Sequence, residues 1–296
     1  MFQILRREIM KKEIIFIFYH MGISKYALGQ MYRFLDVPDL MDILQGEYLF
    51  YSLNSIDFTE KDIDILNMTK KSDEIKHEAE QVLLEMKNEK CALIYYYDDD
   101  YPINLRSIPN PPFFILVRGD YTILNSEKIV SIVGSRHISS ITKKSINNRV
   151  KELVARNFVT VSGLAFGTDI AVHRDTYNLG GQTVAVLPSS IFSIQPKAHE
   201  EDVKKILANG GAVISEYYKE DQFSKIRYID RNRIISGLSK YIILTEFEEK
   251  SGTMHTARFA WKQKRKIFCF NNLSSGIQKV INSDEGTIYE GADSLI

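Results

Sequence analysis

The stretch Ile129-Val130-Ser131-Ile132-Val133-Gly134-Ser135-Arg136 decides the fold: a short apolar run that stops at a glycine and two polar residues. A run this rich in β-branched residues is typical of a strand buried on both faces of a sheet. Similar runs follow at 159–162, 183–187, 212–215, 241–245 and 266–270, and helical patterns lie between them near 141–156, 169–179, 199–208, 231–238 and 253–263. Strands that alternate with helices predict an α/β fold with a doubly wound, mostly parallel sheet.

The front of the chain has a different pattern. Apolar residues recur there at steps of three and four, which predicts helices up to about residue 88. Four prolines then fall within residues 102–112, and such a cluster breaks helices and marks a junction. We therefore expect a small all-helical domain over residues 1–90 and the α/β domain over residues 91–296.

Charge is divided unevenly along the chain. Lysine and arginine together number 38, as do aspartate and glutamate, so the formal net charge is zero. Residues 1–125 nevertheless hold 14 basic against 20 acidic residues, and residues 126–296 hold 24 against 18. An anionic ligand is therefore expected to meet the second half of the chain.

Several classes of protein are disfavoured. Cys91 and Cys269 lie far apart, and the six histidines have no metal-ligand spacing, so neither a disulfide framework nor a metal site is expected. No apolar run approaches the ~20 residues that span a bilayer. These features predict a cytoplasmic protein without a membrane segment. The dinucleotide and Walker-type phosphate motifs are both missing, and no cofactor is expected.

Candidate binding residues follow the predicted strands, because the carboxyl ends of parallel strands share one edge of the sheet. Small and hydroxyl residues there let a backbone approach closely and bind anions through hydrogen bonds. The candidates are Gly134, Ser135, Arg136, Ser162, Gly163, Gly167, Ser251, Gly252 and Thr253. Arg231 and Arg233 offer planar forks that match phosphate groups, although they also fit a solvated helix start.

Asp169 and His173 lie one turn apart on one predicted helix face. The spacing fits acid–base chemistry, and it also fits a carboxylate–imidazole pair that braces the glycine-rich loop. We favour the bracing role.

Taken together, these segments resemble the DprA/Smf family of DNA-processing proteins, which serve bacterial natural transformation. The matching series spans about residues 97–270. It comprises Tyr97–Pro102, Ile132–Arg136, Ser162–Asp169 with His173, Thr183–Leu187, Ser215-Glu216, Arg231–Ser239, and Glu246 with Ser251-Gly252-Thr253. Residues 12–88 are similar only in outline to the family's small N-terminal helical domain, of sterile-alpha-motif or helix-hairpin-helix type.

The resemblance implies an extended Rossmann-like domain that binds single-stranded DNA as a dimer and helps to load the recombinase RecA, with no catalytic reaction. By position it assigns DNA contacts to Gly134, Ser135 and Arg136 in the first loop, to Ser162, Gly163 and Gly167 in the second, and to Lys197, Arg231 and Arg233. Asp169, His173 and Glu246 are expected to support these loops. Phe166 is a candidate for stacking on bases, whereas we favour a buried position for Phe192.

The sequence departs from the family in the loop after the third strand. Gln195 precedes Pro196 where tyrosine is usual, Pro188 and Ser190 replace common glycines, and His199 replaces asparagine. These departures leave the DNA contacts of that loop open. Many members also carry a small winged-helix-like domain after the Rossmann-like one, and the sequence given stops at Ile296.

A second interpretation is a nucleotide sensor or an enzyme similar to nucleoside phosphoribohydrolases. Glu246 is then the base or a sugar ligand beside Ser251-Gly252-Thr253. The double-glycine loop and helix glutamate of that group are missing, because Met254-His255-Thr256 follow instead. We therefore favour the DNA-binding function.

Overall fold

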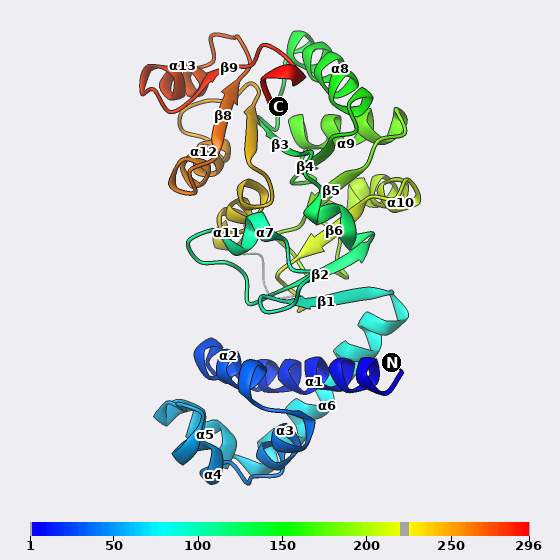
Figure 1. Cartoon of the computed structure of the whole chain (residues 1–296). Helices are drawn as coiled ribbons and strands as arrows, with labels where there is room; N and C mark the ends of the chain where they lie inside the picture. The colour runs from blue at the N-terminus through cyan, green and yellow to red at the C-terminus, as the bar shows by residue number, and fades with distance from the viewer. Residues whose placement is uncertain (1, 220–224, 296) are drawn as a thin grey trace. The chain divides into compact units, whose positions relative to one another are not determined.

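The computed structural model describes residues 2–219 and 225–295. The chain divides into two compact units, residues 1–97 and 98–296 (Figure 1). The strand β1 (Cys91–Tyr95) falls in the first unit. In the described part of the chain, no helix has both the length and the apolarity that crossing a membrane requires.

The first unit is built mainly of helices. They are α1 (Phe2–Met21), α2 (Lys25–Phe34), α3 (Val37–Leu44), α4 (Leu49–Asn54), α5 (Glu60–Asn67) and α6 (Thr69–Asn88). The apolar run Ile14–Phe18 is buried in α1, which packs against α2, α3 and α6. Capping boxes start two of the helices, with Asp36 and Asp39 at α3 and Thr59 and Asp62 at α5.

The second unit contains a mostly parallel sheet. Its strands are β2 (Phe114–Gly119), β3 (Ile129–Val133), β4 (Val159–Ser162), β5 (Thr183–Val186), β6 (Ala212–Ser215), β7 (Tyr241–Leu244), β8 (Lys266–Cys269) and β9 (Thr287–Ile288). They lie in the order β2-β6-β5-β4-β3-β7-β8-β9, and only the β2–β6 pair is antiparallel. The predicted doubly wound sheet is confirmed, and all six predicted strands form.

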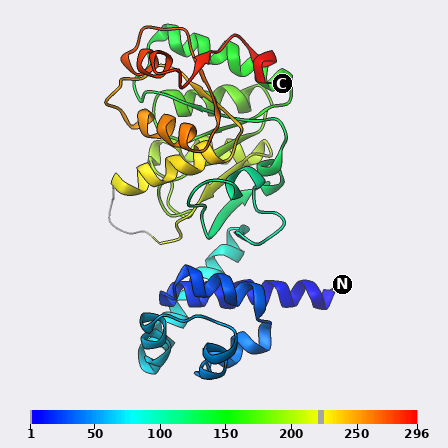
Figure 2. The ribbon, with the colours of Figure 1, turned by 60° about the vertical axis from the view of Figure 1, so that its left-hand side comes forward.

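Helices cover both faces of this sheet (Figures 1 and 2). After the short α7 (Ile103–Arg106) come α8 (Ser140–Ala155), α9 (Thr168–Asn178) and α10 (Glu200–Ala208) on one face. The other face carries α11 (Lys225–Gly237), α12 (Gly252–Lys262) and α13 (Ser275–Asn282). Helix α11 begins six residues before the predicted start at Arg231, a difference that matters for the site.

The chain reverses its direction of winding at β3, which lies between β4 and β7. Open α/β sheets bind ligands at such a switch point, beyond the carboxyl ends of the strands. The loops after β3, β4 and β7 meet there.

Candidate functional site

Hydrogen bonds join the three loops at the switch point. The Ser135 amide donates to the carbonyl of Glu246 at 2.7 Å, and the Thr253 hydroxyl donates to the carbonyl of Gly134 at 2.8 Å. The Thr168 amide donates to the carbonyl of Ser135 at 3.0 Å. The three loops thus form one rigid rim.

Two of the glycines are needed for this close approach. A Cβ atom at Gly134 would collide with the hydroxyls of Thr245 and Thr168. Gly167 has a φ of +75°, and a Cβ atom there would overlap the backbone of Ser135 and Arg136. These glycines let loops pack on one another.

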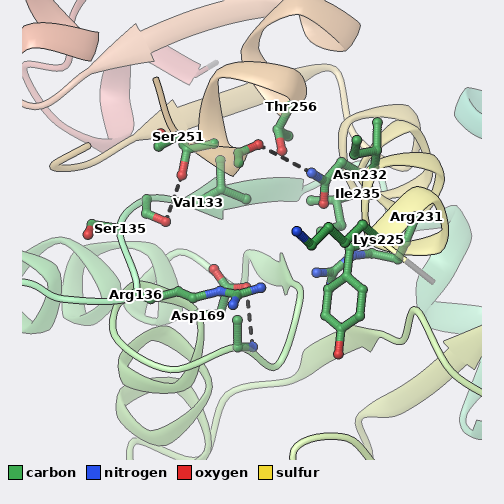
Figure 3. Close-up of a pocket in the computed structure, with 16 residues that line it drawn as sticks. Val133, Ser135, Arg136, Asp169, Lys225, Arg231, Asn232, Ile235, Ser251 and Thr256 are labelled. Carbon is green, nitrogen blue, oxygen red and sulfur yellow. Dashed lines mark hydrogen bonds between the residues drawn. The ribbon is translucent and has the colours of Figure 1, made fainter. Parts of the chain in front are cut away.

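A pocket of about 490 Å³ opens at the rim (Figure 3). Its lining comprises Val133, Gly134, Ser135, Arg136, Ala165, Asp169, Lys225, Tyr228, Ile229, Arg231, Asn232, Ile235, Ser251, Gly252, Thr253 and Thr256. Among these described residues, Arg136, Lys225 and Arg231 are basic and Asp169 is acidic. The pocket therefore favours an anionic ligand.

Arg136 and Lys225 carry the available positive charge. Both side chains are exposed, and neither forms an ion pair with any residue that the structure describes. The Arg136 guanidinium lies 5.7 Å from the centre of the Tyr228 ring, within cation–π range. A cation beside an aromatic ring suits a ligand with both phosphates and flat bases.

The pocket also receives the start of α12. Ser251 is the N-cap residue, but its side chain makes no capping hydrogen bond. Its hydroxyl is buried and has no hydrogen-bond partner among the described residues. A helix start supplies free amides and a positive dipole end, both of which attract anions.

Arg231 forms the floor of the pocket. The side chain is buried, and its Nη1 atom donates to the carbonyls of Gly163 at 2.5 Å and Val186 at 2.7 Å. Asp169 lies beside it and accepts a hydrogen bond from the Ala165 amide at 3.3 Å. Burial raises the pKa of the Asp169 carboxyl, and the charge of Arg231 opposes that rise.

Arg233 does not line the pocket, contrary to the expectation of a second phosphate-binding fork there. Its Nη2 atom donates to both carboxylate oxygens of Glu216, at 2.9 and 2.7 Å, and the side chain is buried. Positions two residues apart on a helix are rotated by about 200° around its axis, so the side chains of Arg231 and Arg233 point in different directions. The ion pair joins α11 to the end of β6.

The remaining predicted residues do not line the pocket. The Ser162 hydroxyl donates to the carbonyl of Ile132 at 2.7 Å in the core. Gly163 and Gly167 lie in the loop after β4, and Lys197 is exposed on a 3₁₀ turn (Lys197–His199). Phe166 is half exposed, with its ring against His199, and Phe192 is half-buried.

The expected pair of Asp169 and His173 is not formed. Nδ1 of His173 is 2.8 Å from the Thr183 hydroxyl, and Nε2 is buried without a partner among the described residues. Burial lowers the pKa of His173 to about 3. Asp169 thus braces the glycine-rich loop alone, while His173 joins α9 to β5.

Glu246 holds the start of α8. Its carboxylate accepts hydrogen bonds from the Ser139 amide at 3.0 Å and the Ser139 hydroxyl at 2.8 Å. Partial burial acts to raise its pKa, but hydrogen bonds from Thr142 and Ser139 hold the pKa below its usual value. Glu246 does not line the pocket, so this geometry does not favour its use as a base there.

Sequence reasoning missed several lining residues on α11. Lys225, Tyr228, Asn232 and Ile235 follow steps of three and four, so they share one helix face turned to the pocket. The helix predicted from the sequence begins only at Arg231, so it leaves out Lys225 and Tyr228 and does not show this periodicity. A prediction that extended the helix back to Lys225 would have shown that these residues share one face.

Comparisons with known proteins identify the family of the chain. The profile of the family described as DNA recombination-mediator protein A matches residues 92–296. The chain is 31% identical over 231 residues to the DNA processing protein DprA of Bacillus subtilis, a match that covers 74% of this chain and 77% of that protein. It is 32% identical over 203 residues to DprA of Streptococcus pneumoniae, covering 67% and 71%.

Solved structures extend the similarity to the fold. The X-ray structure of DNA processing protein A from Streptococcus pneumoniae matches with a TM-score of 0.71 at 25% identity, over 96% of each chain. The protein from Helicobacter pylori, described for its single-stranded DNA binding mode, matches with a TM-score of 0.62 at 25% identity, over 70% of this chain and 94% of that one. The chain belongs to the DNA recombination-mediator protein A family, which confirms the resemblance to DprA/Smf proteins.

Proposed function

We propose that the pocket at the switch point binds the backbone of single-stranded DNA. The observation that carries the proposal is the pair of exposed cations, Arg136 and Lys225, beside Tyr228 and the uncapped start of α12. Cations and amides neutralise phosphates and release counterions. An aromatic ring adds stacking that accepts any base.

The Helicobacter pylori relative is described as a single-stranded DNA-binding protein, which supports the same ligand class here. A base must leave its stack to lie against the Tyr228 ring, and the bases of a single strand do so more readily than the paired bases of a duplex. We therefore expect a strong preference for unpaired DNA.

The proposed role is that of a mediator that protects single-stranded DNA and delivers it to a RecA-type recombinase. It acts as a homodimer in the cytoplasm and catalyses no reaction. The site supports a purely binding role in one respect: Asp169, the single carboxylate among the described lining residues, is buried and hydrogen-bonded to the loop it braces. The enzyme interpretation requires a carboxylate that reaches the substrate as a base or a sugar ligand.

The test is fluorescence anisotropy with labelled oligothymidine and its duplex, titrated across salt. Arg136→Ala and Lys225→Ala should each weaken binding and flatten the salt dependence by about 0.7 in slope for one phosphate contact. Lys144→Ala, which removes an exposed charge of α8 that does not line the pocket, is the matched control. Affinities that are unchanged in both pocket variants would exclude this pocket.

Delivery to a recombinase is tested separately. The wild-type chain should speed the assembly of RecA filaments on DNA coated with single-strand-binding protein, and Arg136→Ala should not. Release of free base from a nucleoside monophosphate, lost in Glu246→Gln, would instead support the enzyme interpretation.

A further inference from the structure

A second hollow lies next to the pocket, on the other side of the start of α12. It has a volume of about 690 Å³ and is lined by Lys225, Glu249, Lys250, Ser251, Gly252, Met254, His255 and Arg258. Lys225, Ser251 and Gly252 also line the first pocket, so the two hollows share a border.

The second hollow is cationic. Lys225, Lys250 and Arg258 are exposed, and none of them forms an ion pair with the described residues. Glu249 is the one acidic residue in the lining. Exposed cations on a concave surface raise the local concentration of anions.

No side chain projects from Gly252, at the border between the two hollows. A Cβ atom built at Gly252 meets nothing within 4 Å, so the surface is open at this residue. Beyond it, Met254, His255 and Arg258 follow helical steps along one side of α12. The backbone at Gly252 is therefore open to an extended chain that passes from one hollow to the other.

We propose that the second hollow is a distinct phosphate subsite, into which a bound single strand continues from the first pocket across Ser251-Gly252. Lys250 and Arg258 hold phosphates there, and Lys225 is shared between the two hollows. This inference rests on the proposed DNA-binding function. It adds the path of the strand, and it adds Lys250 and Arg258 as phosphate-binding residues that no sequence motif indicated.

The two subsites can be distinguished by comparing a short oligonucleotide, which fills the first pocket alone, with a long one that reaches both. Oligothymidines of about 4 and about 12 nucleotides lie within the range of about 4–16 nucleotides that single-strand-binding domains of the OB type occupy. The double variant Lys250→Ala/Arg258→Ala should bind the short oligonucleotide like the wild type. For the long one it should lose affinity, with a salt slope lower by about 1.4 for two lost phosphate contacts.

The double variant Lys262→Ala/Lys264→Ala is the control, since it removes two exposed charges at the opposite end of α12. It should change neither affinity. An equal loss for both lengths in the Lys250→Ala/Arg258→Ala variant would show general charge attraction and overturn the subsite, as would no loss for either length. Failure of the wild type to bind either oligonucleotide would instead refute the proposed function.

Discussion

The Nη1 atom of Arg231 lies 2.5 Å from the carbonyl oxygen of Gly163, so the arginine that the sequence motif offers to a ligand is bound by the protein itself. The same atom reaches the carbonyl of Val186 at 2.7 Å. One buried guanidinium thus joins α11 to the ends of β4 and β5. The shape of the pocket floor depends on this link.

Arg231→Lys should therefore destabilise the fold although it keeps the charge. A lysine ammonium lacks the planar fork, and it would leave buried carbonyls or its own charge without partners. We expect the free energy of unfolding to fall by about 1–3 kcal/mol in urea denaturation. Arg136→Lys, at an exposed position, is the control and should change stability little. Equal stability of the two variants would show that the Arg231 link is weak.

Gly252 allows a test that separates binding from stability. Because its Cβ would meet open space, Gly252→Ala and Gly252→Leu should both fold, with alanine stabilising by about 0.4–1 kcal/mol. Leucine should obstruct the border of the pocket and weaken oligothymidine binding at least about tenfold, a cost of roughly 1.4 kcal/mol. Thermal melts and anisotropy on the same samples measure the two effects. Identical affinity across glycine, alanine and leucine would show that DNA does not pass this point.

The sheet was predictable from the sequence because its strands are buried on both faces. Runs such as Ile129–Val133 are short and rich in β-branched residues, and they alternate with helical patterns, which favours strands of a parallel sheet. Strand β2 was missed, because the prolines before it suggested a junction. The short β9, with exposed side chains, has no apolar signal.

The site was predictable only in part. Spacing placed Gly134, Ser135 and Arg136 correctly at the strand end, where they line the pocket. It did not show that Arg233 turns away to Glu216, since the direction of a side chain depends on where its helix starts and what packs beside it. The same limitation hid Lys225 and Tyr228, which belong to the part of α11 that the sequence analysis left out.

Tyr228 should contribute through its ring rather than its hydroxyl. Tyr228→Phe keeps the surface on which a base can stack and should bind oligothymidine nearly like the wild type. Tyr228→Ala should lose about 1–3 kcal/mol of binding free energy. Titrations at high salt, where phosphate contacts are weakened, make the difference clearest. An equal loss in both variants would assign the effect to the hydroxyl.

His173 should make the stability of the fold depend on pH. Burial lowers its pKa to about 3, while the charge of Asp202 opposes that shift, so the imidazole stays neutral in the folded chain. The unfolded chain takes up a proton at this residue near pH 6.5, its ordinary pKa. As the pH falls below about 6.5, protonation therefore favours the unfolded state, and the free energy of unfolding decreases until the folded pKa is reached.

Between pH 7 and pH 5 this residue alone should lower the free energy of unfolding by about 2 kcal/mol, because the loss is about 1.36 kcal/mol for each pH unit below 6.5. His173→Gln removes the titrating group, so it should be less stable than the wild type at pH 7 but lose about 2 kcal/mol less on acidification. Urea denaturation of both proteins at several pH values measures the difference between their free energies of unfolding. The contributions of the other titrating groups are common to both proteins and cancel in this difference. Parallel pH profiles would show that His173 takes up its proton over the same pH range in the folded and the unfolded chain, against the burial that the structure gives it.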